Sequence, residues 1–161
     1  GAWCYYENDE TKGKLYNWFA VMGIHDNDEN TPNKELAPEG WHVPSDAEWT
    51  TLEEHLIANG YNYDGTTTEN KIGKAMASTT GWDSSTGTGA IGNDQSLNNS
   101  SGFNAFPEGY RTNNFGSGAN SSAFWSSTAF IFLLSGSSQG VSITGGTITD
   151  SFGFSVRFVR D

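Results

Sequence analysis

Cysteine, leader signals and long hydrophobic runs are missing or scarce in this sequence, and each absence excludes something. Cys4 is the only cysteine among 161 residues, so no disulfide can form within the chain. No window approaches the roughly eighteen consecutive apolar residues of a membrane-spanning helix, so we expect no membrane insertion. The chain opens Gly-Ala-Trp, without an initiator methionine, a basic region or an apolar signal core. This start is typical of a processed or excised piece.

Basic residues are also few. Eight Lys and Arg residues stand against nineteen Asp and Glu residues, for a formal net charge of -11. Nucleic acids and anionic membranes are bound by clustered Lys and Arg, so neither is expected as a partner. Acidity of this kind serves solubility at least as readily as it attracts a specific cationic partner.

Aromatic residues and glycine are what the sequence has in quantity. Aromatics make up 14% of the chain, and its 161 residues are enough for the core of one domain. Only 17% of the residues are charged, and 20 glycines accompany long stretches of Ser, Thr and Asn. This composition favours loops and short strands over long helices.

Helix signals lie in the N-terminal half. Apolar residues recur at helical spacing over residues 14–22 and predict a first helix there. Ser45 and Glu48 have the spacing of a capping box, which predicts a second helix that ends at Asn59 and Gly60. A third, weaker helical turn is predicted within residues 69–77.

Strand signals fill the C-terminal half, after a loop-like region over residues 79–101 that is too long for a compact domain unless it is packed or functional. Short strands are predicted over residues 102–106, 123–127, 129–134, 141–144, 147–149 and 152–159. In the last of these, Phe154, Val156 and Phe158 alternate with polar neighbours and are expected to share one face.

The order of these elements predicts an α+β fold. Short helices occupy the N-terminal half, and short antiparallel strands with long loops occupy the C-terminal half. No second core-sized segment is present, so residues 1–161 are expected to form a single domain.

The run from Pro38 to Trp49, PEGWHVPSDAEW, resembles the signature of the Fibrobacter succinogenes major paralogous domain family. Further segments agree with that family in order and spacing, namely 13–18, 101–106, 109–111, 124–128 and 153–160. The resemblance covers nearly the whole chain and implies a C-type-lectin-like fold, similar to that of the formylglycine-generating enzymes. The usual opening strand of the family is absent, so the natural domain is expected to begin upstream.

Two departures from the family pattern concern cysteine. Members often carry Cys just before the Pro-Glu-Gly-Trp-His run and again in the final strand, where the two could form a bridge. Ala37 and Phe158 stand at those positions here. The resemblance therefore implies that packing, with Phe158 as a substitute, replaces a covalent link.

Catalytic signals are weak. The chemistry of the formylglycine-generating enzymes uses a copper-binding cysteine pair, and Cys4 alone excludes it. His25, His42 and His55 share no metal-ligand spacing, and for His42 a structural hydrogen bond is expected. No nucleophile elbow, phosphate loop or zinc helix is present. Carboxylates on the second helix leave a hydrolase as a third alternative.

The acidic loop over residues 26–30 has oxygen ligands at alternate positions, as a calcium-binding loop requires. No glycine follows at the sixth position, and Leu36 and Ala37 stand where a bidentate Glu is needed. A flexible acidic loop is the favoured interpretation, and we expect neither a metal nor a cofactor.

Two stretches have an unusual composition. Every residue from 111 to 124, and every residue from 130 to 152 except Gln139, can be encoded with a third-position pyrimidine. A diversity-generating retroelement, which randomises adenines in Asn-type codons, leaves this imprint, and such systems favour C-type-lectin-like displays. Under this hypothesis, residues 111–152 form a variable ligand surface. The alternative is a strand-rich tail that is biased toward Ser, Gly and Thr by composition alone.

The predicted ligand contacts are Phe130, Phe132, Leu134, Ser142, Thr144, Thr147 and Thr149. If the apolar members are exposed they form a binding patch, and the alternative is that they face inward as core strand residues. We predict a non-catalytic recognition domain, outside a bacterial cell or on a phage of such a host, whose partner is a protein or a glycan. The runner-up is a fixed adhesive or structural module of a larger envelope protein.

Overall fold

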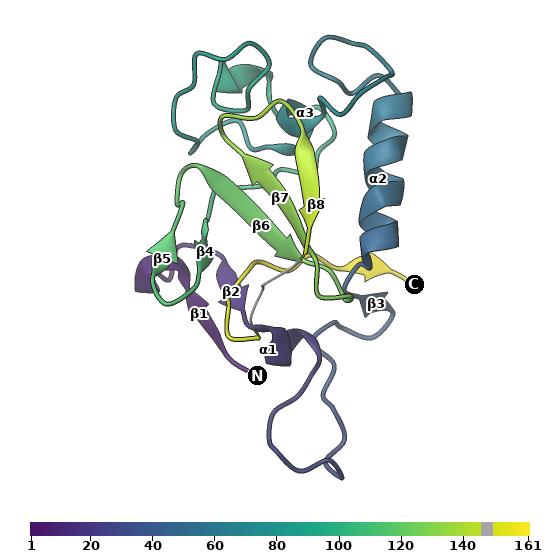
Figure 1. Ribbon diagram of the computed structural model, residues 1–161, viewed down its shortest axis with the longest axis vertical. Coiled ribbons are helices and arrows are strands. Elements are labelled where there is room, and N and C mark those ends of the chain that lie inside the picture. Colours follow the sequence, from purple (N-terminus) through teal and green to yellow (C-terminus); the bar gives the residue numbers. More distant parts are fainter. Residues whose placement is uncertain (146–149) are drawn as a thin grey trace.

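The computed structural model describes residues 1–145 and 150–161, and it has the mixed α+β architecture that the sequence predicts (Figure 1). Its helical elements are η1 (Tyr6–Asn8), α1 (Trp18–Val21), α2 (Asp46–Ala58), α3 (Gly73–Met76) and η2 (Gln95–Leu97). Its strands are β1 (Trp3–Tyr5), β2 (Lys14–Tyr16), β3 (Trp41–His42), β4 (Tyr110–Arg111), β5 (Phe115–Gly116), β6 (Ser121–Trp125), β7 (Ile131–Ser135), β8 (Val141–Thr144) and β9 (Val159–Arg160).

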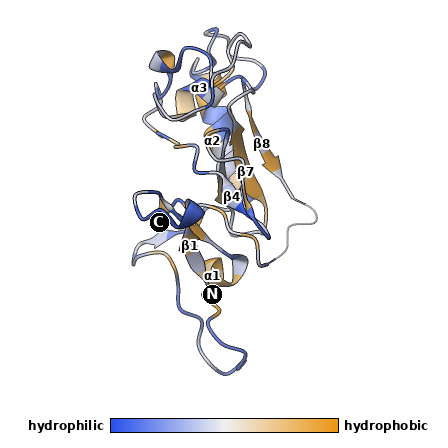
Figure 2. Ribbon diagram, turned by 90° about the vertical axis from the view of Figure 1, so that its left-hand side faces the viewer, coloured by the Kyte–Doolittle hydropathy of each residue, from blue (hydrophilic) through white to orange (hydrophobic). Residues whose placement is uncertain are grey.

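The antiparallel sheet β6-β7-β8 forms the centre of the molecule. The two-stranded pairs β1-β2, β3-β9 and β4-β5 lie around it. Figure 2 shows β7 and β8 as hydrophobic strands; β6 and most of β7 are buried, whereas Ser142 and Thr144 of β8 are exposed. Since the side chains of a strand alternate between faces, β7 supplies residues to two separate cores.

The first core lies between the sheet and α2. Phe132 is fully buried there, and its ring stacks on that of Trp49 with centroids 4.4 Å apart and planes 9° from parallel. The second core lies on the opposite face, where Trp125 packs edge-on to Phe154 with centroids 4.8 Å apart. Burial of these large rings is the main apolar contribution to the stability of the fold.

Helix α2 confirms the capping-box prediction. The Ser45 hydroxyl accepts a hydrogen bond from the Glu48 amide at 3.3 Å, and the Glu48 carboxylate accepts one from the Ser45 amide at 2.8 Å. The helix ends at Ala58, and Gly60 follows with a φ of 76°, a left-handed conformation that glycine adopts without strain. Trp49 and Leu56 are buried against the sheet.

The prediction of a helix over residues 14–22 is wrong in its first half. Residues 14–16 form β2, because Leu15 pairs with Cys4 in β1 and the Tyr16 backbone bonds to that of Phe154. Helix α1 begins only after Asn17, whose side chain accepts a hydrogen bond from the Ala20 amide at 3.0 Å. The third predicted helix is shorter than expected, since α3 covers residues 73–76 alone.

The strand predictions are confirmed at the central sheet. The strand over residues 141–144 has the predicted bounds, β6 lies two residues before the predicted 123–127, and β7 begins two residues and ends one residue after the predicted 129–134. The offset arises at the turn, where the Ser126 hydroxyl accepts hydrogen bonds from the amides of Thr128 and Phe130 and thereby ends pairing at Trp125.

Elsewhere the strands are less regular than predicted. Residues 102–106 contain only an isolated bridge between Ala105 and Ala77. Residues 152–159 make isolated bridges, and the ladder of β9 begins only at Val159. The predicted alternation in this segment nevertheless holds, since Phe154, Val156 and Phe158 all pack into the second core. The strand predicted over 147–149 lies outside the described residues.

The long loop over residues 79–101 is packed rather than free. The buried Lys74 ammonium donates hydrogen bonds to the carbonyls of Ala90, Asn93 and Asp94. Ile91 is fully buried in the first core, which fixes the loop from its apolar side. The loop is therefore packed, as a loop of this length in a compact domain is expected to be.

The outer border of the sheet carries a side-chain cap. The Asn70 amide donates to the Val141 carbonyl at 2.9 Å and accepts from the Val141 amide at 3.0 Å. A side chain thus takes the place that a neighbouring strand would occupy at this point of β8. In the part of the chain that the structure describes, no helix has the length and apolar character needed to cross a bilayer.

Candidate functional site

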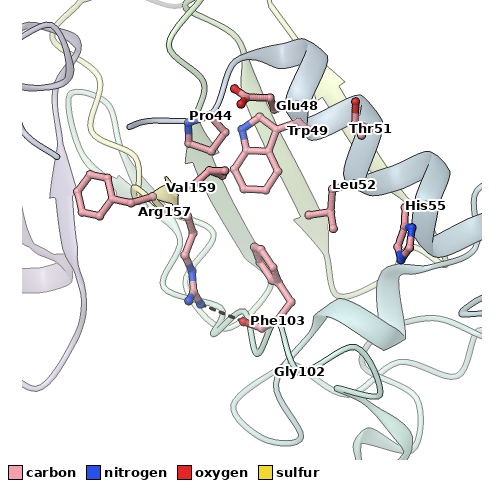
Figure 3. Close-up of a pocket in the computed structure, with 11 residues that line it drawn as sticks. Pro44, Glu48, Trp49, Thr51, Leu52, His55, Gly102, Phe103, Arg157 and Val159 are labelled. Carbon is pink, nitrogen blue, oxygen red and sulfur yellow. Dashed lines mark hydrogen bonds between the residues drawn. The ribbon is translucent and has the colours of Figure 1, made fainter. Parts of the chain in front are cut away.

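An open groove of about 590 Å³ lies between α2, the loop at Gly102 and Phe103, and the C-terminal segment 157–159 (Figure 3). Its volume is within the range of known ligand sites. The side chains of Trp49 and Leu52 reach from α2 toward Phe103, while Arg157 lies on the opposite side. Three segments that are distant in the sequence therefore build one site.

The floor of the groove is apolar and rigid. The ring of Phe103 packs edge-on against those of Trp49, at 6.0 Å, and Phe124, at 5.6 Å. The Trp49 indole nitrogen donates to the Trp125 carbonyl at 3.4 Å, so it is turned to the core and not to a ligand. Leu52 and Val159 complete a floor whose side chains offer no free polar atom.

Arg157 is the cation of the groove. Its guanidinium carbon lies 4.9 Å from the ring centroid of Phe103 and 5.6 Å from that of Phe124. Its Nη2 atom donates to the carbonyls of Phe103, at 3.2 Å, and Asn104, at 3.3 Å. Burial lowers the pKa of Arg157, and the charge of Glu108 partly offsets this effect. Among the described residues no carboxylate lies within ion-pair distance of it.

His42 links the groove to the C-terminal strand. Its Nε2 atom lies 2.8 Å from the Glu48 carboxylate, and its Nδ1 atom lies 2.7 Å from that of Asp161. Hydrogen bonds to Asp161 and then Glu48 raise the pKa of His42. The Ser45 amide and then His42 lower the pKa of Glu48. The structural hydrogen-bonding role expected for His42 is thus observed.

The family model of the Fibrobacter succinogenes major domain matches residues 1–160 of this chain, including every segment that builds the groove. The chain belongs to this family. No curated protein matches the chain, and no solved structure matches it. The groove of this Fibrobacter succinogenes major domain is built from its motif segments, because Trp49, Phe103 and Arg157 each lie in a run that carries the resemblance.

The predicted contact residues of this Fibrobacter succinogenes major domain are divided by the structure. Phe132 and Leu134 are fully buried in the first core, so their prediction as surface contacts is wrong and the inward-facing alternative applies. Phe130 is 40% exposed, and Ser142 and Thr144 are exposed. Thr147 and Thr149 lie outside the described residues.

The exposed predicted residues do not form one patch. Phe130 lies against Gly145, which continues the face of β8 that carries Val141 and Ile143. Ser142 and Thr144 point to the opposite face of the same strand, because side chains alternate along it. None of these residues lines the groove.

The sequence does not predict the groove, because each residue that lines it is already accounted for as part of a helix or a strand. Trp49 and Leu52 lie in the predicted second helix, and Phe103 lies in the strand predicted over residues 102–106. The available signal was that these motif runs, together with the one that contains Arg157, all belong to the resemblance. These segments come together only in the folded structure, and the spacing of residues along the chain does not reveal that contact.

The acidic loop over residues 26–30 directs its carboxylates to its own backbone. Asp26 accepts from the Asp28 amide at 2.9 Å, and Asp28 accepts from the Asn30 amide at 3.0 Å. Within residues 1–145 and 150–161, no group of three or more His, Cys, Asp or Glu side chains is arranged to hold a metal ion.

Proposed function

We propose that this domain is a non-catalytic recognition module that binds its ligand in the groove between α2 and residues 157–159. The observation that carries the proposal is an apolar floor of packed rings next to an exposed cation that has no carboxylate partner in the described structure. Sites of this kind bind by burying apolar surface and orient the ligand through a few polar groups.

The state of the ionisable groups favours binding over catalysis. Glu48 and His42 are each held by two partners, so neither is poised as a free acid or base. Burial raises the pKa of Glu53, which would suit a general acid, but Glu53 bonds to Asn70 and does not line the groove. A hydrolase therefore remains the less supported alternative.

We further propose a C-type-lectin-like arrangement of these elements and display outside a bacterial cell or on a phage. The paired β3 and β9 strands and the small central sheet support the first, and the family resemblance supports the second. A variable surface within 111–124 and 130–152 is restricted to exposed positions such as Arg111, Phe130 and Ser142, because β6 is buried throughout and most of β7 is buried.

Two substitutions of matched exposure test which surface binds. Val159 is 38% exposed in the groove, and Phe130 is 40% exposed outside it. The labelled domain is screened on a glycan array and with a phage library of random peptides. We expect Val159→Asp to abolish binding to the selected ligands and Phe130→Asp to retain it.

Circular dichroism and thermal melting show that both variants fold. If Phe130→Asp loses binding while Val159→Asp keeps it, the groove is not the site and the β8 surface is. If neither library yields a ligand, the recognition proposal gives way to a fixed adhesive or structural module.

A further inference from the structure

Building on the proposed function, we infer that the ligand is an extended peptide that places an apolar side chain on the groove floor and an adjacent carboxylate on Arg157. The shape and polarity of the floor, the free donors of the guanidinium and the free backbone beside it each restrict the ligand in a different way. Together they select a class of peptide rather than a sugar.

The floor selects an apolar group. The side chains of Leu52, Phe103 and Val159 are apolar, and the one polar atom of the Trp49 side chain is already bonded to the core, while the polar lining side chains are those of Glu48, Thr51, His55 and Arg157. A sugar ring placed against these apolar side chains would bury hydroxyl groups without partners, which is unfavourable. A large aliphatic or aromatic side chain loses nothing comparable and gains the burial of its apolar surface.

The guanidinium selects a carboxylate. Both printed hydrogen bonds of Arg157 use Nη2, which leaves the donors on Nε and Nη1 without a protein acceptor in the described residues. The rings of Phe103 and Phe124 fix the plane of the group. The guanidinium is exposed and has no carboxylate partner among the described residues, so an incoming carboxylate can reach it and gain a charge-assisted bond at a pre-oriented site.

The backbone beside Arg157 selects a peptide. The amides and carbonyls of Arg157 and Phe158 make no hydrogen bond to any residue that the structure describes, whereas the next residue, Val159, is paired with His42. An extended peptide has amides and carbonyls at the spacing of a strand and can satisfy these groups. Its alternate side chains then reach the floor and the guanidinium from one backbone.

The test begins with peptides enriched by the wild-type domain from a random phage-displayed library, made synthetically and measured by calorimetry. We expect a large apolar residue close to Asp or Glu in the enriched set. Replacing that acidic residue by its amide should weaken binding to the wild type at least about tenfold. The same replacement in the peptide should hardly change its binding to the Arg157→Gln variant, because that variant lacks the positive charge that the acidic residue contacts.

Arg160→Gln is the matched control, since Arg160 is an exposed arginine of β9 that does not line the groove. This variant should bind like the wild type. The coupling energy between Arg157 and the acidic residue of the peptide comes from a double-mutant cycle of four binding measurements. A modest loss of stability in Arg157→Gln does not affect this energy, provided that circular dichroism shows the variant to be folded.

Three results would overturn the inference, and they separate it from the proposed function. Enriched peptides without an acidic residue, or without coupling to Arg157, contradict the carboxylate contact. Enrichment on the glycan array alone, abolished by Val159→Asp, contradicts the peptide class but leaves the groove as the site. Loss of binding only in variants outside the groove removes both proposals.

Discussion

His42 shows how a single residue ties three parts of the molecule together. One imidazole bonds to Glu48 at the start of α2 and to Asp161 beyond β9, while its own backbone pairs with Val159. Because both partners are carboxylates, the protonated form of His42 is favoured in the fold, and its pKa lies above the ordinary 6.5.

The sign of the pH dependence follows from this shift. A raised pKa means that the stabilisation by His42 is fully present below about pH 6.5 and is lost as the pH rises through the raised value. We therefore expect the melting temperature of the wild type to fall over that range. His42→Gln should lack this component, and His55→Gln, on the exposed side of α2, should keep it. Equal pH profiles for wild type and His42→Gln would contradict the assignment.

At the scale of elements, local signals were sufficient where the chain itself satisfies its backbone. The bounds of α2 follow from Ser45 and Glu48, which bond to each other across one helical turn. Residues 14–16 carry a helical pattern but are extended, because their hydrogen bonds come from β1 and from Phe154, far along the chain. The groove escaped prediction for the same reason, since Phe103 and Arg157 meet only in space.

The Lys74 ammonium group is one of the anchors of the loop over residues 79–101. Lys74→Met keeps the apolar stem but leaves the Asn93 carbonyl without its donor, while the carbonyls of Ala90 and Asp94 keep their bonds from the amides of Asn93 and Leu97. We expect a loss of about 1–3 kcal/mol in the free energy of unfolding. Hydrogen exchange should rise within the loop while α2 stays protected. Uniform loosening of both would show that Lys74 supports the whole core instead.

At the scale of the whole molecule, the central sheet is shared by two cores, and β7 contributes to both. Phe132→Ala should lower the free energy of unfolding by about 3–5 kcal/mol, because it removes the ring that stacks on Trp49. Phe130→Ala, two residues away and 40% exposed, should cost much less. Chemical denaturation measures both. Similar losses would show that Phe130 is also a packing residue.

The bond between the Asn70 side chain and β8 affects how the domain behaves at high concentration. A sheet border with free amides and carbonyls invites the same border of another copy, and this is how many β-rich proteins begin to aggregate. By bonding both backbone groups of Val141, Asn70 covers one end of that border with an uncharged side chain. At high concentration, less of this border is therefore open to backbone pairing with another copy of the domain.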